Sequence, residues 1–257
     1  MNPSQRVAEL LLRCGSGESI LPATELFNEG WMLRLVLDWA SAHPRSISAL
    51  PFDEGSSWYS EALLGSRFKP RSRGDASGEG FTHADAVIGH FQLRPGGRGD
   101  IELLADARQL TVVEAKLASG LSPGIKHAPD YNQAARNVAC IAHLLESQPD
   151  CGASITNCGF VVLAPSARIQ EGAFRLVNSE DIGRAVRKRA EAFDAATLEW
   201  CDRAFAAVLA RCRIVVVSWE AVLDQIEAVD PPSAVGLRRF YADCLRWNPL
   251  LPAKRAV

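Results

Sequence analysis

The sequence has no apolar run long enough to cross a bilayer as a helix, which takes about 20 predominantly apolar residues. The N-terminal segment, MNPSQRVAELLLRCGSGES, has one short apolar stretch and no small-residue cleavage site, so we expect no secretory signal peptide. Neither sign of charge dominates, because 28 Lys and Arg residues stand against 30 Asp and Glu residues, for a formal net charge of -2. Any contact with nucleic acid must therefore come from a local basic patch.

Paired cysteine motifs are absent as well. Seven cysteines occur, an odd number at irregular spacing, and no C-x-x-C pair is present, which argues against a structural zinc site. Most of the thiols lie within apolar runs, where a reduced cysteine behaves as a small hydrophobic residue. We therefore expect a protein of a reducing, cytoplasmic compartment, with no membrane partner.

The common catalytic signatures are missing too: the chain has no G-x-x-x-x-G-K-[ST], no G-x-S-x-G and no H-E-x-x-H. These absences argue against P-loop nucleotide hydrolases, serine hydrolases with a nucleophile elbow and zinc metalloproteases. What the chain does have is length and apolar content. Its 257 residues, 47% of them hydrophobic, are enough to bury one full core.

Hydrophobic periodicity predicts a chain in which helices alternate with strands. Apolar residues recur at helical spacing in some segments, and short valine-rich or alternating runs bounded by turn residues indicate strands in others. The predicted helices are 3–14, 24–42, 56–68 around Glu61, 131–147 with Asp130 as N-cap, 180–210, 220–228 and 235–246. The predicted strands are 84–93, 100–104, 110–117, 159–164 and 212–219.

The short connections between the first three strands predict antiparallel hairpins. The element order then predicts an α/β fold, in which a mixed sheet containing a three-strand antiparallel meander is flanked by helices. We divide the chain into an N-terminal helical region, residues 1–55, packed on the core, and a core with C-terminal helices, residues 56–257.

The segment GDIELLADARQLTVVEAKL carries the candidate chemistry. Side chains alternate across a strand, so Glu114 and Lys116 project from the same face. A hairpin centred near Ala107 would place Asp100 opposite Glu114. Two carboxylates and a lysine suit metal-assisted phosphodiester cleavage, because hard oxygen ligands bind Mg²⁺ and the cation polarises the phosphoryl group and acidifies water. The lysine would orient that water or neutralise charge on phosphorus.

Asp100 followed by Glu114-Ala115-Lys116 resembles the signature of the PD-(D/E)xK nuclease superfamily, across roughly residues 56–165. The resemblance implies a restriction-endonuclease-like core, with Asp100 and Glu114 as ligands of Mg²⁺ or Mn²⁺ and Lys116 as the catalytic lysine. The sequence departs from the signature at Gly99, which stands where many members have proline.

A second aspartate, Asp85, competes with Asp100 for the metal. Asp85 is the ligand if residues 84–93 are the strand that precedes the E-x-K strand and residues 94–109 are an elaborated hairpin. The plain meander favours Asp100, because it would make the Asp85 strand parallel to the E-x-K strand. Both aspartates are kept as catalytic and metal-binding candidates.

The helix after the E-x-K strand supplies further candidates. Gln133, Arg136 and Asn137 fall on one face of that helix, which is similar to the glutamine-bearing helix that follows E-x-K in RecB-like nucleases. The resemblance therefore implies a supporting catalytic role for Gln133, and the ordinary alternative is a solvated polar face. It also implies a glutamate before the meander as an extra metal ligand, for which Glu61 is the first candidate and Glu29 the rival.

These features predict a metal-dependent nuclease, with DNA favoured as the substrate and RNA as the alternative. The competing hypothesis is a catalytically inactive module with this fold that binds nucleic acid or a protein. The sequence leaves the oligomeric state open, a homodimer included. The candidate phosphate contacts are Arg67, Lys69, Arg71, Arg73, Lys126, His127, Arg184, Arg187, Lys188 and Arg189.

Overall fold

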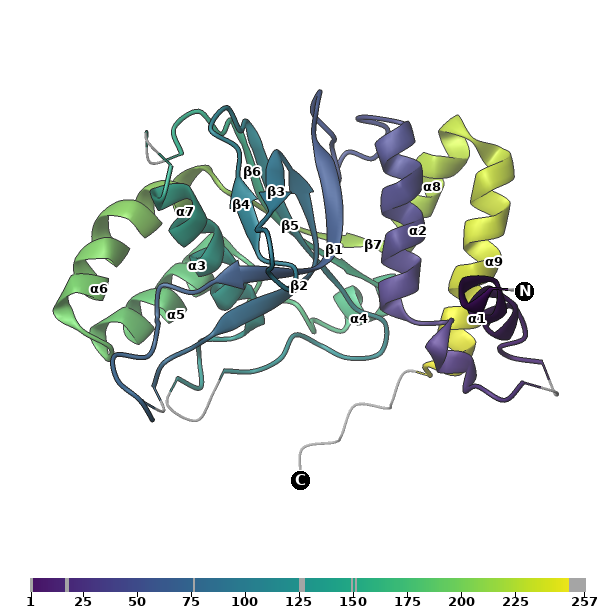
Figure 1. Cartoon of the computed structure of the whole chain (residues 1–257), viewed down its shortest axis with the longest axis horizontal. Helices are drawn as coiled ribbons and strands as arrows, with labels where there is room; N and C mark the ends of the chain where they lie inside the picture. Colours follow the sequence, from purple (N-terminus) through teal and green to yellow (C-terminus); the bar gives the residue numbers. More distant parts are fainter. Residues whose placement is uncertain are drawn as a thin grey trace.

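The structure of the protein, a computed structural model, describes residues 2–16, 19–75, 77–124, 128–148, 150 and 152–249 (Figure 1). No helix in these ranges is long and apolar enough to cross a membrane. The helical elements are α1 (Pro3–Leu12), η1 (Ala23–Glu25), α2 (Glu29–Ala42), α3 (Gln133–Glu146), α4 (Ser166–Gln170), α5 (Ser179–Glu191), α6 (Ala195–Trp200), η2 (Cys201–Phe205), α7 (Ala206–Arg211), α8 (Trp219–Val229) and α9 (Pro231–Trp247). The strands are β1 (Ser57–Gly65), β2 (Phe81–Gly89), β3 (Phe91–Leu93), β4 (Ile101–Leu103), β5 (Gln109–Ala115), β6 (Asn157–Ala164) and β7 (Arg213–Ser218).

A five-stranded mixed sheet in the order β1-β2-β5-β6-β7 forms the centre of the molecule, which is an α/β fold with helices on both faces. The first three strands pair antiparallel, and β5, β6 and β7 run parallel. β3 and β4 form a separate two-stranded ladder between β2 and β5 in the chain. The parallel pairs need crossover connections, and α3 supplies the one from β5 to β6.

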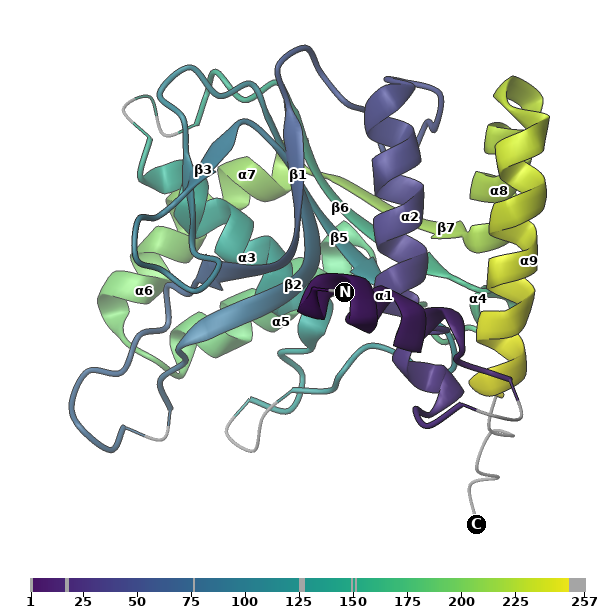
Figure 2. The ribbon, with the colours of Figure 1, turned by 45° about the vertical axis from the view of Figure 1, so that its right-hand side comes forward.

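Two hydrophobic clusters cover the two faces of the sheet. On one face α3, α5, α6 and α7 pack against alternate residues of the strands, including Val112 and Val162. On the other face α2, α8 and α9 pack against the intervening residues, including Val113 and Val161 (Figure 2). The central strands are therefore buried on both sides, which explains why β5 and β6 are apolar runs rather than alternating ones.

The helices of the N-terminal region join this second layer. Asn28 caps α2 by accepting a hydrogen bond from the backbone N–H of Trp31, and Met32, Leu33, Val36 and Leu37 bury the inner face of the helix. α2 packs on α9 as well as on the sheet, so residues from the two ends of the chain share one cluster.

The predicted helix at 56–68 is wrong: most of this segment is β1. Its strand pattern is hidden because the alternation of faces switches within it. Trp58 packs on the α2 face and Tyr59 on the α3 face, but Ala62 and Leu64 also lie on the α3 face. Glu61, between them, has φ of 56°, in the left-handed region that non-glycine residues rarely adopt.

The same switch occurs in the neighbouring strand. Ala84 and Val87 both lie on the α3 face of β2, while Ala86 lies on the α2 face. The register pairs Ser60 with Ala86 and Ala62 with Ala84, so Glu61 lies opposite Asp85. In both strands, therefore, the alternation of side chains between the two faces of the sheet breaks at the same position along the pair. Asp85 lies at that position.

The predicted pairing of 100–104 with 110–117 is also wrong. Residues 101–103 pair with 91–93 in the small ladder, and β5 pairs with β2 instead. The strand that contains Asp85 is consequently antiparallel to the E-x-K strand, not parallel to it. The structure retains a three-strand antiparallel meander, but it consists of β1, β2 and β5, with the β3–β4 hairpin inserted.

Other sequence expectations are confirmed with adjusted bounds. The helices at the two ends, the helix after β5 and the last two strands occur where they were predicted. The N-cap of α3 is Asn132 rather than Asp130, because the Asn132 side chain accepts from the Ala135 N–H. The predicted helix at 180–210 is divided into α5, α6, η2 and α7. Six free cysteines are buried in the described residues, and Cys151 lies outside them.

The left-handed conformation of Glu61 leads to a stability prediction. An L-residue in this region is less stable by about 1 kcal/mol than glycine, which has no Cβ to clash. We expect Glu61→Gly to be more stable than Glu61→Ala by about that amount, measured by urea unfolding followed by tryptophan fluorescence. Both variants lose the same exposed ion pair with Arg34, so the comparison isolates the backbone. Equal stability of the two variants would contradict the assignment.

Candidate active site

Glu114, near the end of strand β5, and Lys116, the residue after the strand, lie on the α3 face of the sheet. Val112 and Glu114 lie on this face and Val113 and Ala115 on the other, as alternation requires. The Glu114 side chain has no exposed surface and the Lys116 side chain is 11% exposed. The ammonium donates to Glu114 Oε1 at 2.5 Å. A buried carboxylate is therefore held beside the lysine two positions further along the chain.

Asp85 joins them from the antiparallel neighbour. The β2–β5 ladder pairs Ala86 with Val113 and stops there, so Asp85 lies opposite Glu114 at the point where the strands separate. One Asp85 oxygen, Oδ2, accepts the backbone N–H of Ala115 at 2.8 Å and lies 3.9 Å from the Lys116 ammonium. The side chain thus takes the place of the next backbone partner in the ladder, and it is 26% exposed.

Helix α3 completes the surroundings of Glu114. Gln133, the first residue of the helix, donates through Nε2 to Glu114 Oε1 at 2.5 Å, and Asn137, one turn later, donates through Nδ2 to Oε2 at 3.3 Å. Residues four apart lie on the same helix face, which is why both amides reach one carboxylate. Both oxygens of Glu114 are therefore hydrogen-bonded, as a buried carboxylate requires.

The electrostatics of the group follow from burial and from the second carboxylate. Burial and the charge of Asp85 raise the pKa of Glu114, Lys116 opposes both effects, and the net result is a pKa of about 8. For Lys116, burial lowers the pKa, but the negative charges of Glu114, Asp85 and Glu29 outweigh it and the net shift is upward. Lys116 is therefore held in its protonated form next to Glu114 and Asp85.

Asp100, the aspartate that the sequence favoured, does not join this group. It bridges to Leu63 of β1, and its Oδ2 accepts the backbone N–H of Arg98 in the turn before β4. It lines a different cavity, beside the C-terminal half of α3. The prediction that Asp100 faces Glu114 is wrong because residue 100 belongs to the β3–β4 hairpin, whose partner is not β5.

Of the two candidate glutamates, Glu61 lies outside the group and Glu29 lies near it. Glu61 is on β1 rather than on a helix, is exposed, and pairs with Arg34 of α2 at 3.2 Å. Glu29 begins α2 and is partly buried, and its charge contributes to the raised pKa of Lys116. The local sequence around Glu61 contained no sign of this difference, because it depends on how α2 packs on the sheet.

One contact of the site was missed by sequence reasoning. The indole Nε1 of Trp219, the fully buried first residue of α8, donates to the backbone carbonyl of Lys116 at 2.9 Å. The two residues are 103 positions apart in the chain, and no local pattern links them. This bond and the one from the Lys116 N–H to the Leu163 carbonyl of β6 hold the end of the E-x-K segment in place.

Most of the predicted phosphate contacts are occupied by partners within the chain. Arg71 pairs with Asp75, Arg187 with Asp202 and Lys188 with Asp130. Arg189 is buried and lies over the rings of Phe68 and Phe193. Lys126 and His127 lie outside the described residues.

Asp85 and Glu114 have the ligand chemistry of a Mg²⁺ site. Mg²⁺ takes one or two protein carboxylates and keeps several water molecules, so two carboxylates are enough. Asp85 also has about a quarter of its side-chain surface, 26%, open to solvent. No group of three or more His, Cys, Asp or Glu side chains suited to a metal occurs in the described part of the chain. A cation would therefore complete its coordination with water or substrate oxygens.

No family model, curated protein or solved structure matches this chain. The assignment of function therefore rests on the geometry of Asp85, Glu114, Lys116 and Gln133.

The raised pKa of Glu114 predicts how stability depends on pH. A carboxyl group whose pKa is about 8 in the folded chain and 4.5 in the unfolded chain contributes stability that is fully present below pH 4.5 and is lost as the pH rises through about 8. In metal-free buffer we expect the melting temperature of the wild type to fall between pH 5 and about 8.5 relative to that of Glu114→Gln. Calorimetry at several pH values measures this difference.

The matched control is Glu199→Gln, which alters an exposed glutamate paired with Arg203. Its melting temperature is expected to follow that of the wild type at every pH. Parallel curves for the wild type and Glu114→Gln would show that Glu114 is ionised throughout the range.

Proposed function

We propose that the protein is a metal-dependent nuclease that hydrolyses phosphodiester bonds. The observation that carries the proposal is the convergence of Asp85, Glu114 and Lys116 where the β2–β5 ladder ends, on neighbouring antiparallel strands. Two neighbouring carboxylates can bind a divalent cation, and the lysine beside them can bind a phosphate. A purely structural ion pair needs only one carboxylate.

The order of elements supports a restriction-endonuclease-like core for this proposal. α2 precedes the antiparallel meander β1-β2-β5, α3 follows the strand that contains Glu114 and Lys116, and β6 then pairs parallel to β5. The aspartate comes from the middle strand of the meander and the E-x-K from the third. The β3–β4 hairpin is an insertion between them, so Asp85 replaces Asp100 as the proposed ligand.

Each residue has a distinct part in the proposed reaction. Asp85 and Glu114 would hold a Mg²⁺ or Mn²⁺ ion, which when bound supplies charge stabilisation for the phosphoryl group and acidifies water. The Lys116 ammonium, protonated because of its two carboxylates, orients water for attack or neutralises charge on the phosphoryl oxygens. Gln133 and Asn137 position Glu114 by occupying one hydrogen-bonding site on each oxygen. DNA is the first substrate to test and RNA the second.

The alternative is a catalytically inactive module with this fold that binds nucleic acid or a protein. One observation favours it: Glu114 has no exposed surface, and its oxygens are already bonded to Lys116, Gln133 and Asn137. A buried ion pair of this kind can serve packing alone. Catalysis therefore requires the cation to approach from the exposed side of Asp85.

A cleavage assay tests the proposal directly. With Mg²⁺ or Mn²⁺ and either plasmid or single-stranded DNA, we expect cutting by the wild type, abolished by EDTA. Asp85→Asn, Glu114→Gln and Lys116→Ala should each reduce the cleavage rate by about 100-fold or more, because each removes a group that stabilises charge in the transition state.

Asp100→Asn is the matched control, because Asp100 is the rival aspartate that the sequence offered and it lies outside the group. It should cut at the wild-type rate. Loss of cutting in Asp100→Asn with full activity in Asp85→Asn would reverse the assignment. No cutting by the wild type with either metal, on DNA or RNA, would favour the inactive module.

Cation binding separates the two functions without an activity measurement. Saturating Mg²⁺, at about 100 times its Kd, should raise the melting temperature of the wild type by about 5 °C. The shift should be larger at pH 8 than at pH 6, because the cation binds the ionised form of Glu114, whose pKa is raised. Asp85→Asn should show no shift and Asp100→Asn the full shift. A wild-type melting temperature independent of Mg²⁺ and Mn²⁺ at both pH values would contradict the proposed metal site.

A further inference from the structure

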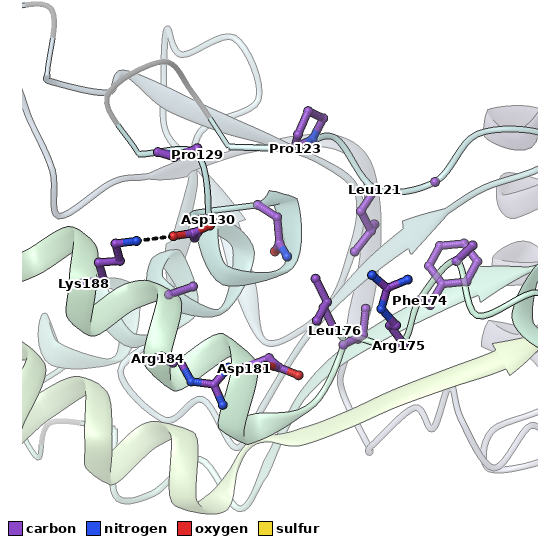
Figure 3. Close-up of a pocket in the computed structure, with 15 residues that line it drawn as sticks. Leu121, Pro123, Pro129, Asp130, Phe174, Arg175, Leu176, Asp181, Arg184 and Lys188 are labelled. Atoms are coloured by element: carbon purple, nitrogen blue, oxygen red, sulfur yellow. Dashed lines mark hydrogen bonds and ion pairs between the residues drawn. The ribbon is translucent and has the colours of Figure 1, made fainter. Parts of the chain in front are cut away.

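A cavity of about 610 Å³ lies beside the candidate site, between the segment that follows β5, the segment that follows α4, and α5 (Figure 3). One wall includes Gly120, Leu121 and Pro123, which lie between four and seven positions after Lys116 in the chain. The cavity is large enough for a ligand of nucleotide size. Its walls include segments that follow the parallel strands β5 and β6 in the chain, and open α/β sheets commonly bind ligands near the carboxyl ends of such strands.

This wall is tied to the carboxylate group through α3. Gln133 accepts the backbone N–H of Ser122 at 3.0 Å with the same side chain that donates to Glu114, and its own N–H donates to the Ser122 carbonyl at 3.0 Å. Arg136 donates to the carbonyl of Pro123 at 3.4 Å. The cavity wall and the hydrogen bonds of Glu114 are therefore held by the same turn of helix.

The lining combines apolar side chains with cations. Leu121 and Leu176 come from facing segments, and Leu176 is 46% exposed although it is apolar. Figure 3 shows the Arg175 guanidinium beside them, with the ion pair of Lys188 and Asp130 across the cavity. An exposed apolar wall with cations at its edge matches a nucleotide, which has an apolar face and an anionic phosphate.

Arg175 is the cation best placed to take a phosphate. Its side chain is exposed and forms no hydrogen bond or ion pair within the described residues, and its positive charge contributes to the lowered pKa of nearby Asp181. Arg184, by contrast, pairs with Asp181 and Glu180, and Lys188 pairs with Asp130, so the charges of these two cations are already partly neutralised. A guanidinium presents several donors in a fork that fits phosphate oxygens.

We propose that this cavity receives one unpaired nucleotide of a single-stranded DNA, with its base against Leu121 and Leu176 and its phosphate at Arg175. The proposal rests on the nuclease function proposed above and names its substrate class. A base paired within a duplex is stacked and cannot enter a cavity, whereas a base in a single strand can. The protein therefore selects single-stranded DNA over duplex.

Binding of a fluorescein-labelled oligonucleotide of about 15 nucleotides, followed by anisotropy in EDTA so that no cutting occurs, tests the cavity. The wild type should bind the single strand about tenfold or more tightly than the same sequence in a blunt duplex. Arg175→Glu and Leu176→Asp should each weaken single-strand binding by about tenfold or more, because they remove the phosphate contact and the apolar wall. Both residues are exposed, so circular dichroism should show unchanged folding.

Arg239→Glu is the matched control. Arg239 is likewise exposed and unpaired within the described residues, but it lies on α9, on the opposite face of the sheet. This variant should bind within about twofold of the wild type, because general charge effects of one residue are small at moderate salt. Equal loss of binding in Arg239→Glu and Arg175→Glu would indicate attraction by overall charge and would overturn the proposal.

The failure of the cavity and the failure of the nuclease function give different results. Metal-dependent cutting by the wild type together with unchanged binding in Arg175→Glu and Leu176→Asp would reject the cavity and keep the nuclease. Binding that depends on Arg175 without cutting under any metal would keep the cavity and reject the nuclease. Equal affinity for single strand and duplex would also overturn the proposed selection.

Discussion

The burial of one carboxylate, that of Glu114, sets the arrangement of the rest of the site. An ionisable group without exposed surface is costly unless donors surround it, and here the donors are Lys116 from the same strand and Gln133 and Asn137 from α3. The face of α3 that supplies these amides is turned to the sheet together with the buried apolar residues of the helix. The same bonds hold the segment after β5, through Gln133 and Ser122, in the position where it forms a cavity wall. Glu114 is therefore linked, through the side chain of Gln133, to the segment that forms the cavity wall.

A second constraint is the separation of β2 from β5 at Asp85. A strand that continued its regular ladder would place a backbone carbonyl against the Ala115 N–H, and no side-chain carboxylate would reach it. Here the Asp85 side chain supplies that acceptor, because β1 and β2 both turn over at the level of Glu61 and Asp85. The left-handed conformation of Glu61 is part of this local distortion. Irregular backbone of this kind is common next to active sites.

The anchoring of the E-x-K segment comes from distant parts of the chain. Trp219 of α8 binds the Lys116 carbonyl, and Leu163 of β6 binds the Lys116 N–H. Helices and strands hold the side chains of a site in position more accurately than a loop does. The face of the sheet opposite the site, formed with α2, α8 and α9, thus contributes to the position of the lysine without touching a substrate.

Local sequence was enough for the elements whose pattern matches one period along their whole length. The helices α2 and α3 and the strands β5, β6 and β7 belong to this group, and so does the conclusion that Glu114 and Lys116 share a face. β1 was misassigned because its alternation of faces breaks at Glu61, which makes a strand resemble a helix over a few residues. Asp100 was preferred to Asp85 because the shortest hairpin was assumed to form, whereas residues 101–103 pair with 91–93.

The sequence by itself determined an α/β chain, a Glu-x-Lys pair on one face of a strand, and a polar helix face after that strand. Each of these three features depends only on residues within a few positions of one another. Only the tertiary structure decided which aspartate faces Glu114, how Glu29 lies relative to Lys116, and where a cavity opens. Strand order and register bring together residues such as Lys116 and Trp219, which are 103 positions apart, and no short-range periodicity records such pairings.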